Sequence, residues 1–428
     1  MVAATQTQTY SHTSHHSQGG TSSVGSLKVR APSSNTAHAS RLSAPLPLTG
    51  AFERYGVHHS DVTPALGTEF DRGSLDLAAL LSADDDKQRE LLTELASLVS
   101  HRGVVFIRGQ RNLSPQLLSN LALKFGEVSG RPNASKLHIH PLSKEFSESG
   151  EFQGEKIDSD RDSAGRQISF PDEKSELASA GWHTDISFEP IPSDYAFLQL
   201  RTLPPCGGDT LWSSMYSAYD ALSEPMKRML EGLTATHDAD MFKDQADRYG
   251  FPLFQGPRGN PDNFGDRLRA VHPVIRTNPV TGWKGLYVNK SFTKRINELT
   301  KDESENMLNY LFRHIAENFN FQVRFRWEQD DLAIWDNRST NVSSPPLIKA
   351  SLSPVKRANF DGAIPFVSTL AYSTSALPSG LQIDAVRLEK NHISTRKAKV
   401  EKQISRVQPP RLADFESISP IQSDGAKK

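Results

Sequence analysis

The sequence predicts a mixed α and β protein, in which short antiparallel strands form a core and a few helices cover it. The 428 residues have 36% hydrophobic content and a formal net charge of −1, which is the balance of a soluble globular chain. Short runs of β-branched and aromatic residues recur along the chain, and between them leucines recur at helical spacing. Many short strands with a few helices favour an antiparallel β core wrapped by helices.

Helix start signals precede three of the four leucine- or methionine-bearing helical stretches. A side-chain oxygen at such a position accepts a hydrogen bond from the first turn, and Thr300 with Glu303 forms a capping box. One predicted helix contains Leu91, Leu92, Leu95, Leu98 and Val99. A second runs from Ser114 to a point before Gly126, and a third starts at Ser223 with Pro225. The fourth follows Thr300 and extends through Met307 and Ile315. The predicted strands cover residues 104–107, 196–200, 286–289, 323–327 and 332–335.

Composition excludes several classes of protein. A single cysteine, Cys206, excludes a disulfide framework and a cysteine-rich zinc site. No apolar run approaches the roughly 18 residues of a membrane span, so no membrane association is expected. The near-zero net charge removes the electrostatic argument for binding nucleic acid. The start lacks an apolar signal-peptide core, so we expect a cytoplasmic location.

Three segments flank or interrupt the predicted domain at residues 51–340. Residues 1–50 are rich in Ser and Thr and contain no acid, which predicts a disordered tail; a metal-binding role of its histidines and a transit peptide are weaker readings. Residues 143–180 are polar and glycine-rich, which predicts a mobile lid. Residues 341–428 change texture again and predict an aberrant, weakly ordered tail with one basic helix.

The sharpest local signal is the pair His183 and Asp185. Side chains alternate along an extended segment, so these two point to the same face and can grip one ion between an imidazole nitrogen and a carboxylate oxygen. With a distant second histidine, such a pair makes the facial triad of non-haem Fe(II), which leaves positions open for a co-substrate and O₂. Alone, the His-x-Asp pattern is weak, and its context decides its meaning.

That context is a series of five motifs in order. They are Leu137-His138-Ile139-His140-Pro141, Trp182-His183-Thr184-Asp185, Gly207-Gly208-Asp209-Thr210-Leu211-Trp212, His272-Pro273-Val274-Ile275-Arg276-Thr277 and Trp335-Asp336-Asn337-Arg338-Ser339-Thr340. Over about residues 102–340 the chain resembles the taurine and alkylsulfonate dioxygenases, in particular the fungal sulfonate dioxygenases. The resemblance implies a double-stranded β-helix, or jelly roll, with flanking helices and an iron site at its mouth.

The resemblance also implies residue roles. His183 and Asp185 match two iron ligands, and Thr210 matches the threonine that helps to hold the distal carboxylate of 2-oxoglutarate. His140 matches the histidine that contacts the substrate sulfonate, and Asn289 is a further substrate-site candidate. Four other motif residues are expected to be structural: His138, His272, Arg276 and Trp335. The family's tyrosine shortly after the substrate histidine is absent, which leaves the choice of sulfonate open.

The implied activity uses Fe(II), with 2-oxoglutarate and O₂ as co-substrates. Hydroxylation of the carbon beside a sulfonate would release an aldehyde and sulfite, with succinate and CO₂ as the other products. The implied partners are a small-molecule sulfonate and, in solution, further copies of the chain as a homo-oligomer; no nucleic acid and no membrane are expected. Two alternatives stay open: oxygenation of another small acid, such as an aryloxyalkanoate, and a non-catalytic jelly-roll pseudoenzyme.

The departure from the family falls at Val342, where the family has the histidine that is the third iron ligand. The first histidine downstream is His392, and neither Arg357 nor Arg387 lies in a recognisable family motif for binding 2-oxoglutarate. Three explanations compete: translated intron sequence followed by a disturbed reading frame, a degenerate homologue, and recruitment of His392 or another donor from the tail. Each predicts impaired activity or an altered iron site in the chain as written.

Overall fold

The computed structural model of the protein describes residues 42–143, 179, 181–201, 203, 208–250 and 252–343. Most of the predicted N-terminal tail, nearly all of the predicted lid and residues 344–428 lie outside the described residues. Cys206, His392 and the two downstream arginines lie outside them as well.

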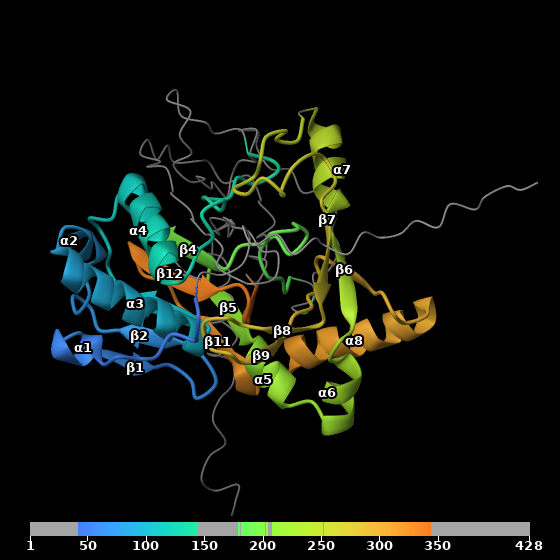
Figure 1. The fold of residues 1–428 in the computed structure, drawn as a ribbon, viewed down its shortest axis with the longest axis horizontal. Coiled ribbons are helices and arrows are strands. Elements are labelled where there is room, and N and C mark those ends of the chain that lie inside the picture. Colours follow the sequence, from blue (N-terminus) through green and yellow to red (C-terminus); the bar gives the residue numbers. More distant parts are fainter. Residues whose placement is uncertain are drawn as a thin grey trace, which may run out of the picture. The chain divides into compact units, whose positions relative to one another are not determined.

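A five-stranded sheet has the strand order β1-β2-β3-β12-β4 (Figure 1). The strands are β1 (His59–Asp61), β2 (Thr68–Phe70), β3 (Val104–Ile107), β12 (Asp331–Asp336) and β4 (Tyr195–Leu200). All residues of β3, β4 and β12 are buried, and β12 pairs antiparallel with both β3 and β4. Three of the predicted strands are therefore confirmed as the centre and one edge of this sheet.

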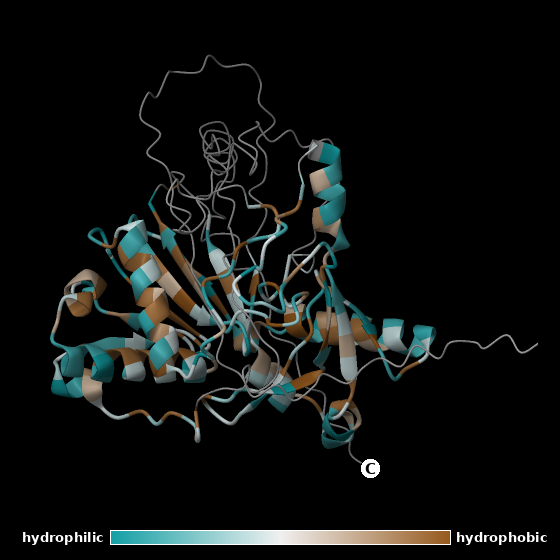
Figure 2. Ribbon diagram, turned by 45° about the horizontal axis from the view of Figure 1, so that its top comes forward, coloured by the Kyte–Doolittle hydropathy of each residue, from teal (hydrophilic) through white to brown (hydrophobic). Residues whose placement is uncertain are grey.

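Two helices pack near this sheet, α3 (Asp85–Arg102) and α4 (Pro115–Val128), and α3 contacts β3, β12 and α4. The side chain of Asp84 accepts a hydrogen bond at the start of α3, and Ser114 does so for α4. The prediction that the second helix ends before Gly126 is wrong. The helix continues to Val128, and its C-cap Ser129 bonds the carbonyl of Phe125 through both its N–H and its hydroxyl, which closes the last turn. Figure 2 shows mostly hydrophobic strands beside helices that also carry hydrophilic residues.

A three-stranded sheet of order β11-β5-β13 carries the end of the described chain. It consists of β11 (Gln322–Phe325), β5 (Thr210–Ser214) and β13 (Thr340–Ser343), and both outer strands run antiparallel to β5. The expected domain boundary at residue 340 falls inside this sheet, because β13 extends to Ser343 and all its residues are buried. Pairing with β5 satisfies the backbone of a polar stretch that has no strand signal of its own.

The other elements complete the described fold. They are α1 (Ala51–Arg54), α2 (Leu77–Leu81), α5 (Met215–Asp220), α6 (Glu224–Leu230), α7 (Asp240–Tyr249), α8 (Lys301–Glu317), the 3₁₀ turn Phe319–Phe321, a sheet of order β10-β6-β7 (Thr293–Ile296, Thr234–Asp238, Arg269–Pro273) and a β8-β9 pair (Ile275–Thr277, Lys284–Leu286). The predicted capping box at Thr300 and Glu303 is confirmed. None of the helices in the described part of the chain is both long and apolar enough to cross a membrane.

The predicted strand at residues 286–289 is only partly right, because β9 ends at Leu286. The reason is a turn centred on Asn289. Its backbone N–H donates to Thr293 Oγ1 at 2.9 Å, and its side-chain oxygen accepts from the backbone N–H of Phe292 at 2.9 Å. Such local bonds satisfy the backbone without a strand partner.

Candidate metal and co-substrate site

His183 and Asp185 come together as their spacing predicts. His183 Nε2 lies 3.5 Å from Asp185 Oδ1; the Asp185 side chain is fully buried, whereas 25% of the His183 side chain is exposed. His183 Nδ1 donates to the carbonyl of Gly181 at 2.9 Å, so the lone pair of the neutral ring lies on Nε2. Two electron-pair donors then face each other, and a cation between them would be stabilised.

A backbone outlier follows the pair directly. Ile186 has a φ of 44°, in the left-handed region that β-branched residues rarely adopt. Its side chain is fully buried, so packing holds this conformation in place. Such strain costs on the order of 1–3 kcal/mol and is found preferentially at functional sites. The outlier lies in the turn that begins at Asp185, two residues after the bridge residue His183.

The register of the strands aligns position 342 with His183. Val342 forms an isolated antiparallel bridge with His183, with N–H to carbonyl distances of 3.0 and 2.7 Å. Val342 is also the partner of Trp212 in β5. Directly opposed residues of antiparallel strands point to the same face of the sheet, so the side chains of His183, Val342 and Trp212 share one face.

Thr210 lies on that face too, because it precedes Trp212 by two positions on β5. Its side chain is buried, and its hydroxyl accepts a hydrogen bond from Trp327 Nε1 at 3.0 Å, which leaves the O–H to donate to a carboxylate. The neighbouring Arg324 pairs with Leu211, hence on the opposite face, and its Nε bonds Asp209 at 2.6 Å. This arginine does not face Thr210.

The two predicted substrate residues have different surroundings. His140 is half-buried and its Nδ1 accepts from the N–H of Leu142 at 3.1 Å, so a neutral ring carries its hydrogen on Nε2 as a donor for an anion. Asn289 is buried, and its Nδ2 donates to Ser187 Oγ at 3.1 Å. Because both ends of its amide bond protein atoms, Asn289 shapes the turn beside Asp185.

Aromatic rings connect the two histidines of the predicted site. The His140 ring lies 4.8 Å from Phe242 of α7, Phe242 lies 6.2 Å from Phe292, and Phe292 lies 6.4 Å from His183. Neither phenylalanine was indicated by a sequence motif, since each is brought there by the tertiary fold.

A hydrogen bond ties the His183–Asp185 segment to the turn after β12. The buried Thr184 hydroxyl donates to the carbonyl of Asn337 at 2.6 Å. Together with the bridge between His183 and Val342, this bond holds the backbone at His183 and at Thr184. The sequence carried no signal for this role of Thr184.

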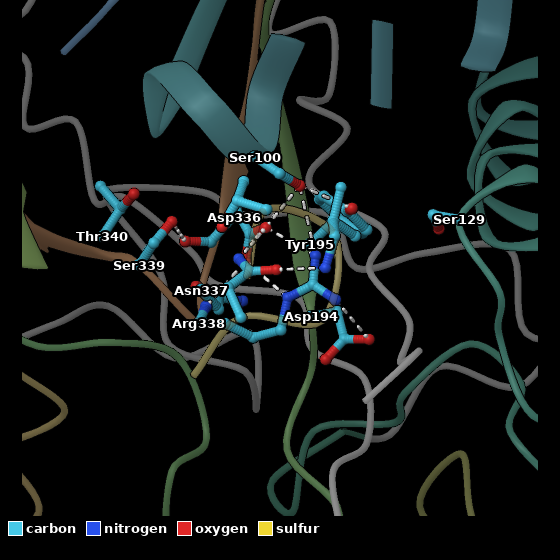
Figure 3. A network of polar contacts seen from close by, with 12 residues as sticks. Ser100, Ser129, Asp194, Tyr195, Asp336, Asn337, Arg338, Ser339 and Thr340 are labelled. Atoms are coloured by element: carbon cyan, nitrogen blue, oxygen red, sulfur yellow. Dashed lines mark hydrogen bonds and ion pairs between the residues drawn. The ribbon is translucent and has the colours of Figure 1, made fainter. Parts of the chain in front are cut away.

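A buried ionic network around Arg338, a residue of that turn, stabilises it (Figure 3). The fully buried Arg338 bonds Asp336 through Nε at 2.8 Å and Nη2 at 2.6 Å, and its Nη1 lies 3.2 Å from Asp194. The guanidinium also lies 4.5 Å from the centre of the Tyr195 ring. Although burial alone would lower it, the two carboxylates raise the pKa of Arg338 above its ordinary value. The turn therefore contains a buried guanidinium, that of Arg338, which stays charged.

Three buried histidines near the site are neutral. Burial lowers the pKa of His272 to about 3, aided by the charge of Arg276, and its Nε2 donates to the carbonyl of Glu189 at 3.0 Å. Burial also lowers the pKa of His138 and of His237 well below the ordinary value. His138, His272, Arg276 and Trp335 are all buried, as expected for structural residues.

The residues present fit a metal ion incompletely. Among the residues that the structure describes, no group of three His, Cys, Asp or Glu side chains is placed to hold one. His183 and Asp185 supply two donors, and the third position on their face is occupied by the 2%-exposed Val342. A carbon side chain offers a metal nothing to bind, so the described site is one donor short of a facial triad.

Comparison with known proteins identifies the family that this chain resembles. The model of the taurine catabolism dioxygenase TauD, TfdA family matches residues 58–341 and so ends one residue before Val342. The chain is 42% identical over 305 residues to alpha-ketoglutarate-dependent dioxygenase btcD of Neocamarosporium betae, covering 69% of this chain and 87% of the relative.

A second relative is the alpha-ketoglutarate-dependent sulfonate dioxygenase of Saccharomyces cerevisiae (strain ATCC 204508 / S288c). It is 32% identical over 285 residues, covering 66% of this chain and 61% of the relative. Among solved structures, a taurine dioxygenase from Burkholderia xenovorans aligns with a TM-score of 0.50 and 25% identity, covering 77% of this chain and 90% of that one.

Proposed function

The chain belongs to the taurine catabolism dioxygenase TauD, TfdA family, and from this membership we propose that it derives from an enzyme that hydroxylates an alkylsulfonate such as taurine. The family uses Fe(II), with 2-oxoglutarate and O₂ as co-substrates. The hydroxylated carbon would release sulfite and leave an aldehyde, while 2-oxoglutarate would yield succinate and CO₂. In the chain as written this activity is impaired, because Val342 replaces a metal donor.

One observation supports the proposal: strand register brings onto one face the positions that the family resemblance assigns to the co-substrate and to two metal donors. Thr210, His183 and position 342 share this face, and Asp185 lies beside His183. The Thr210 hydroxyl is arranged to donate to a carboxylate, as binding of the distal end of 2-oxoglutarate requires. We further propose that the sheets are parts of a double-stranded β-helix, and that the domain begins near residue 51.

Two observations support a sulfonate as the substrate. The yeast relative is named a sulfonate dioxygenase, and a neutral His140, whose Nδ1 accepts from the N–H of Leu142, would carry its hydrogen on Nε2. An imidazole donor would serve a carboxylate as well, which is why an aryloxyalkanoate is the second substrate to assay. The protein's own task is to place the substrate and to exclude water, and the aromatic rings of the partly buried Phe242 and the buried Phe292 between His140 and His183 suit that task.

The non-catalytic alternative is favoured by one specific observation, the apolar side chain at position 342. Under that proposal the fold binds a small anion without turning it over. Homo-oligomer formation would accompany either function and is open to measurement by light scattering.

Succinate and sulfite formation tests the proposal. The chain is supplied anaerobically with Fe(II) and 2-oxoglutarate, then with O₂ and taurine or another alkylsulfonate, beside a version with a histidine-containing family-like end after Thr340. We expect sulfite from the restored version and little or none from the chain as written. Sulfite-free turnover of an aryloxyalkanoate would overturn the substrate assignment. Robust succinate formation that survives His392→Ala would overturn the claim of impairment and also exclude recruitment of His392.

A further inference from the structure

The described fold already contains the backbone position for a third metal donor. We propose that the metal site of this chain is deficient in one side chain rather than in a segment, and that a donor at position 342 alone completes it. The inference rests on the proposed function for the class of metal, a divalent first-row ion.

The pairing of β13 sets the position of residue 342. Thr340–Ser343 forms the outer strand beside β5, with Thr340 opposite Ser214 and Val342 opposite Trp212. All four residues of β13 are buried, and its backbone needs nothing from residues 344–428 to make these bonds.

The bridge to His183 sets the direction of the side chain at position 342. Val342 exchanges both backbone hydrogen bonds with His183, at 3.0 and 2.7 Å. For such a directly opposed pair the Cβ atoms lie about 5 Å apart on the same face. Asp185 already lies within 3.5 Å of the His183 ring on that face. A donor attached at position 342 would therefore reach toward the ion that the pair would share.

Hydrogen bonds and buried ion pairs hold the backbone around position 342. The bond from Thr184 to Asn337, at 2.6 Å, fixes the backbone between the two existing donors to the turn that leads into β13. The buried ion pairs of Arg338 with Asp194 and Asp336 stabilise that turn (Figure 3). A new donor at position 342 would thus enter a site whose geometry is already set, which is the main requirement for affinity at a given number of ligands.

The test measures binding of Co(II), a spectroscopic probe ion, to the full chain by calorimetry and visible absorption. The main variant is Val342→His, and the matched control is Ser343→His, which places the same side chain on the next residue and hence on the other face of β13. We expect Val342→His to bind one Co(II) about a hundredfold more tightly than the unaltered chain. The control should bind no more tightly, and adding Asp185→Asn should remove the gain.

A second variant guards against a failure to fold, since imidazole is larger than the 2%-exposed side chain it replaces. Val342→Cys is close to valine in size, and a thiolate bound to Co(II) gives a charge-transfer band that no other ligand of this site can produce. Ser343→Cys is its control. Circular dichroism and thermal melting establish that each variant is folded.

Two results would overturn the inference. One is tight, stoichiometric Co(II) binding by the unaltered chain that Asp185→Asn abolishes, since another donor would then complete the site. The other is a folded Val342→His or Val342→Cys that binds no better than its control at position 343. Gained metal affinity in the Val342 variants, together with no sulfite from the version with a family-like end after Thr340, would support the inference and count against the proposed function, so the two can fail separately.

Discussion

Replacing Arg338 by methionine is expected to destabilise the fold by about 3–5 kcal/mol, the cost of breaking a buried ion pair by removing one partner. The structure supports that range. Arg338 is fully buried and faces two fully buried carboxylates, Asp194 at 3.2 Å and Asp336 at 2.6 Å. Once the guanidinium is gone, Asp194 retains Arg276 at 3.9 Å, and Asp336 retains hydrogen bonds from Ser100 and from Asn278.

Urea unfolding followed by tryptophan fluorescence measures this cost. The matched control is Arg313→Met, which breaks an exposed pair with Glu317, one helical turn away on α8, and should change the free energy of unfolding far less. Adding Asp336→Asn to Arg338→Met should recover part of the loss, because it removes one uncompensated buried charge. If Arg338→Met lowers the free energy of unfolding no more than Arg313→Met does, the buried network does not stabilise the turn after β12.

Three further changes have expected outcomes. Thr184→Val should lose about 1–3 kcal/mol of stability by orphaning the carbonyl of Asn337, whereas Thr184→Ser should keep the bond; urea unfolding compares them. Gly259→Ala should lower the free energy of unfolding by about 2 kcal/mol more than Gly265→Ala, as measured by thermal melting. Both glycines have positive φ, but only at Gly259 would a Cβ come within 2.7 Å of a backbone atom. Equal losses of stability would contradict this. The neutral buried His272 has a folded pKa of about 3 against an ordinary value of 6.5, so the unfolded chain binds the extra proton and stability falls as pH drops below about 6.5. His272→Asn should reduce the loss between pH 7.5 and 5.5 by about 1.4 kcal/mol, and an unchanged loss would show that this histidine is not the group titrating.

Elements with a strong local signal were predictable from the sequence. The apolar run at Val104–Ile107 is a buried strand, and the capping box before Lys301–Glu317 starts a helix where expected. Thr340–Ser343 was not predictable as a strand, because its polar residues pair only through contacts with β5 that are distant in sequence. The predicted helix end before Gly126 is wrong because the cap that closes the helix lies three residues later, at Ser129.

The same distinction holds for the site. The spacing of His183 and Asp185 predicts their approach, although in the structure only His183 has a strand partner and Asp185 begins a turn. The contacts of Thr184 with Asn337 and of Asn289 with Ser187 join segments more than 100 residues apart. No local pattern encodes such contacts. The assignments of Thr210, His140 and Asn289 to ligand binding stay predictions, which alanine substitution of each residue and ligand titrations can decide.

The affinity of the unaltered chain for Fe(II) tests the central claim most directly. An anaerobic titration of the full chain with 2-oxoglutarate present measures it without any requirement for turnover. Two donors and a valine at position 342 predict weak binding that does not saturate at one equivalent of Fe(II). Tight binding of one Fe(II) per chain would contradict the account, because a third donor would then complete the site from elsewhere in the chain.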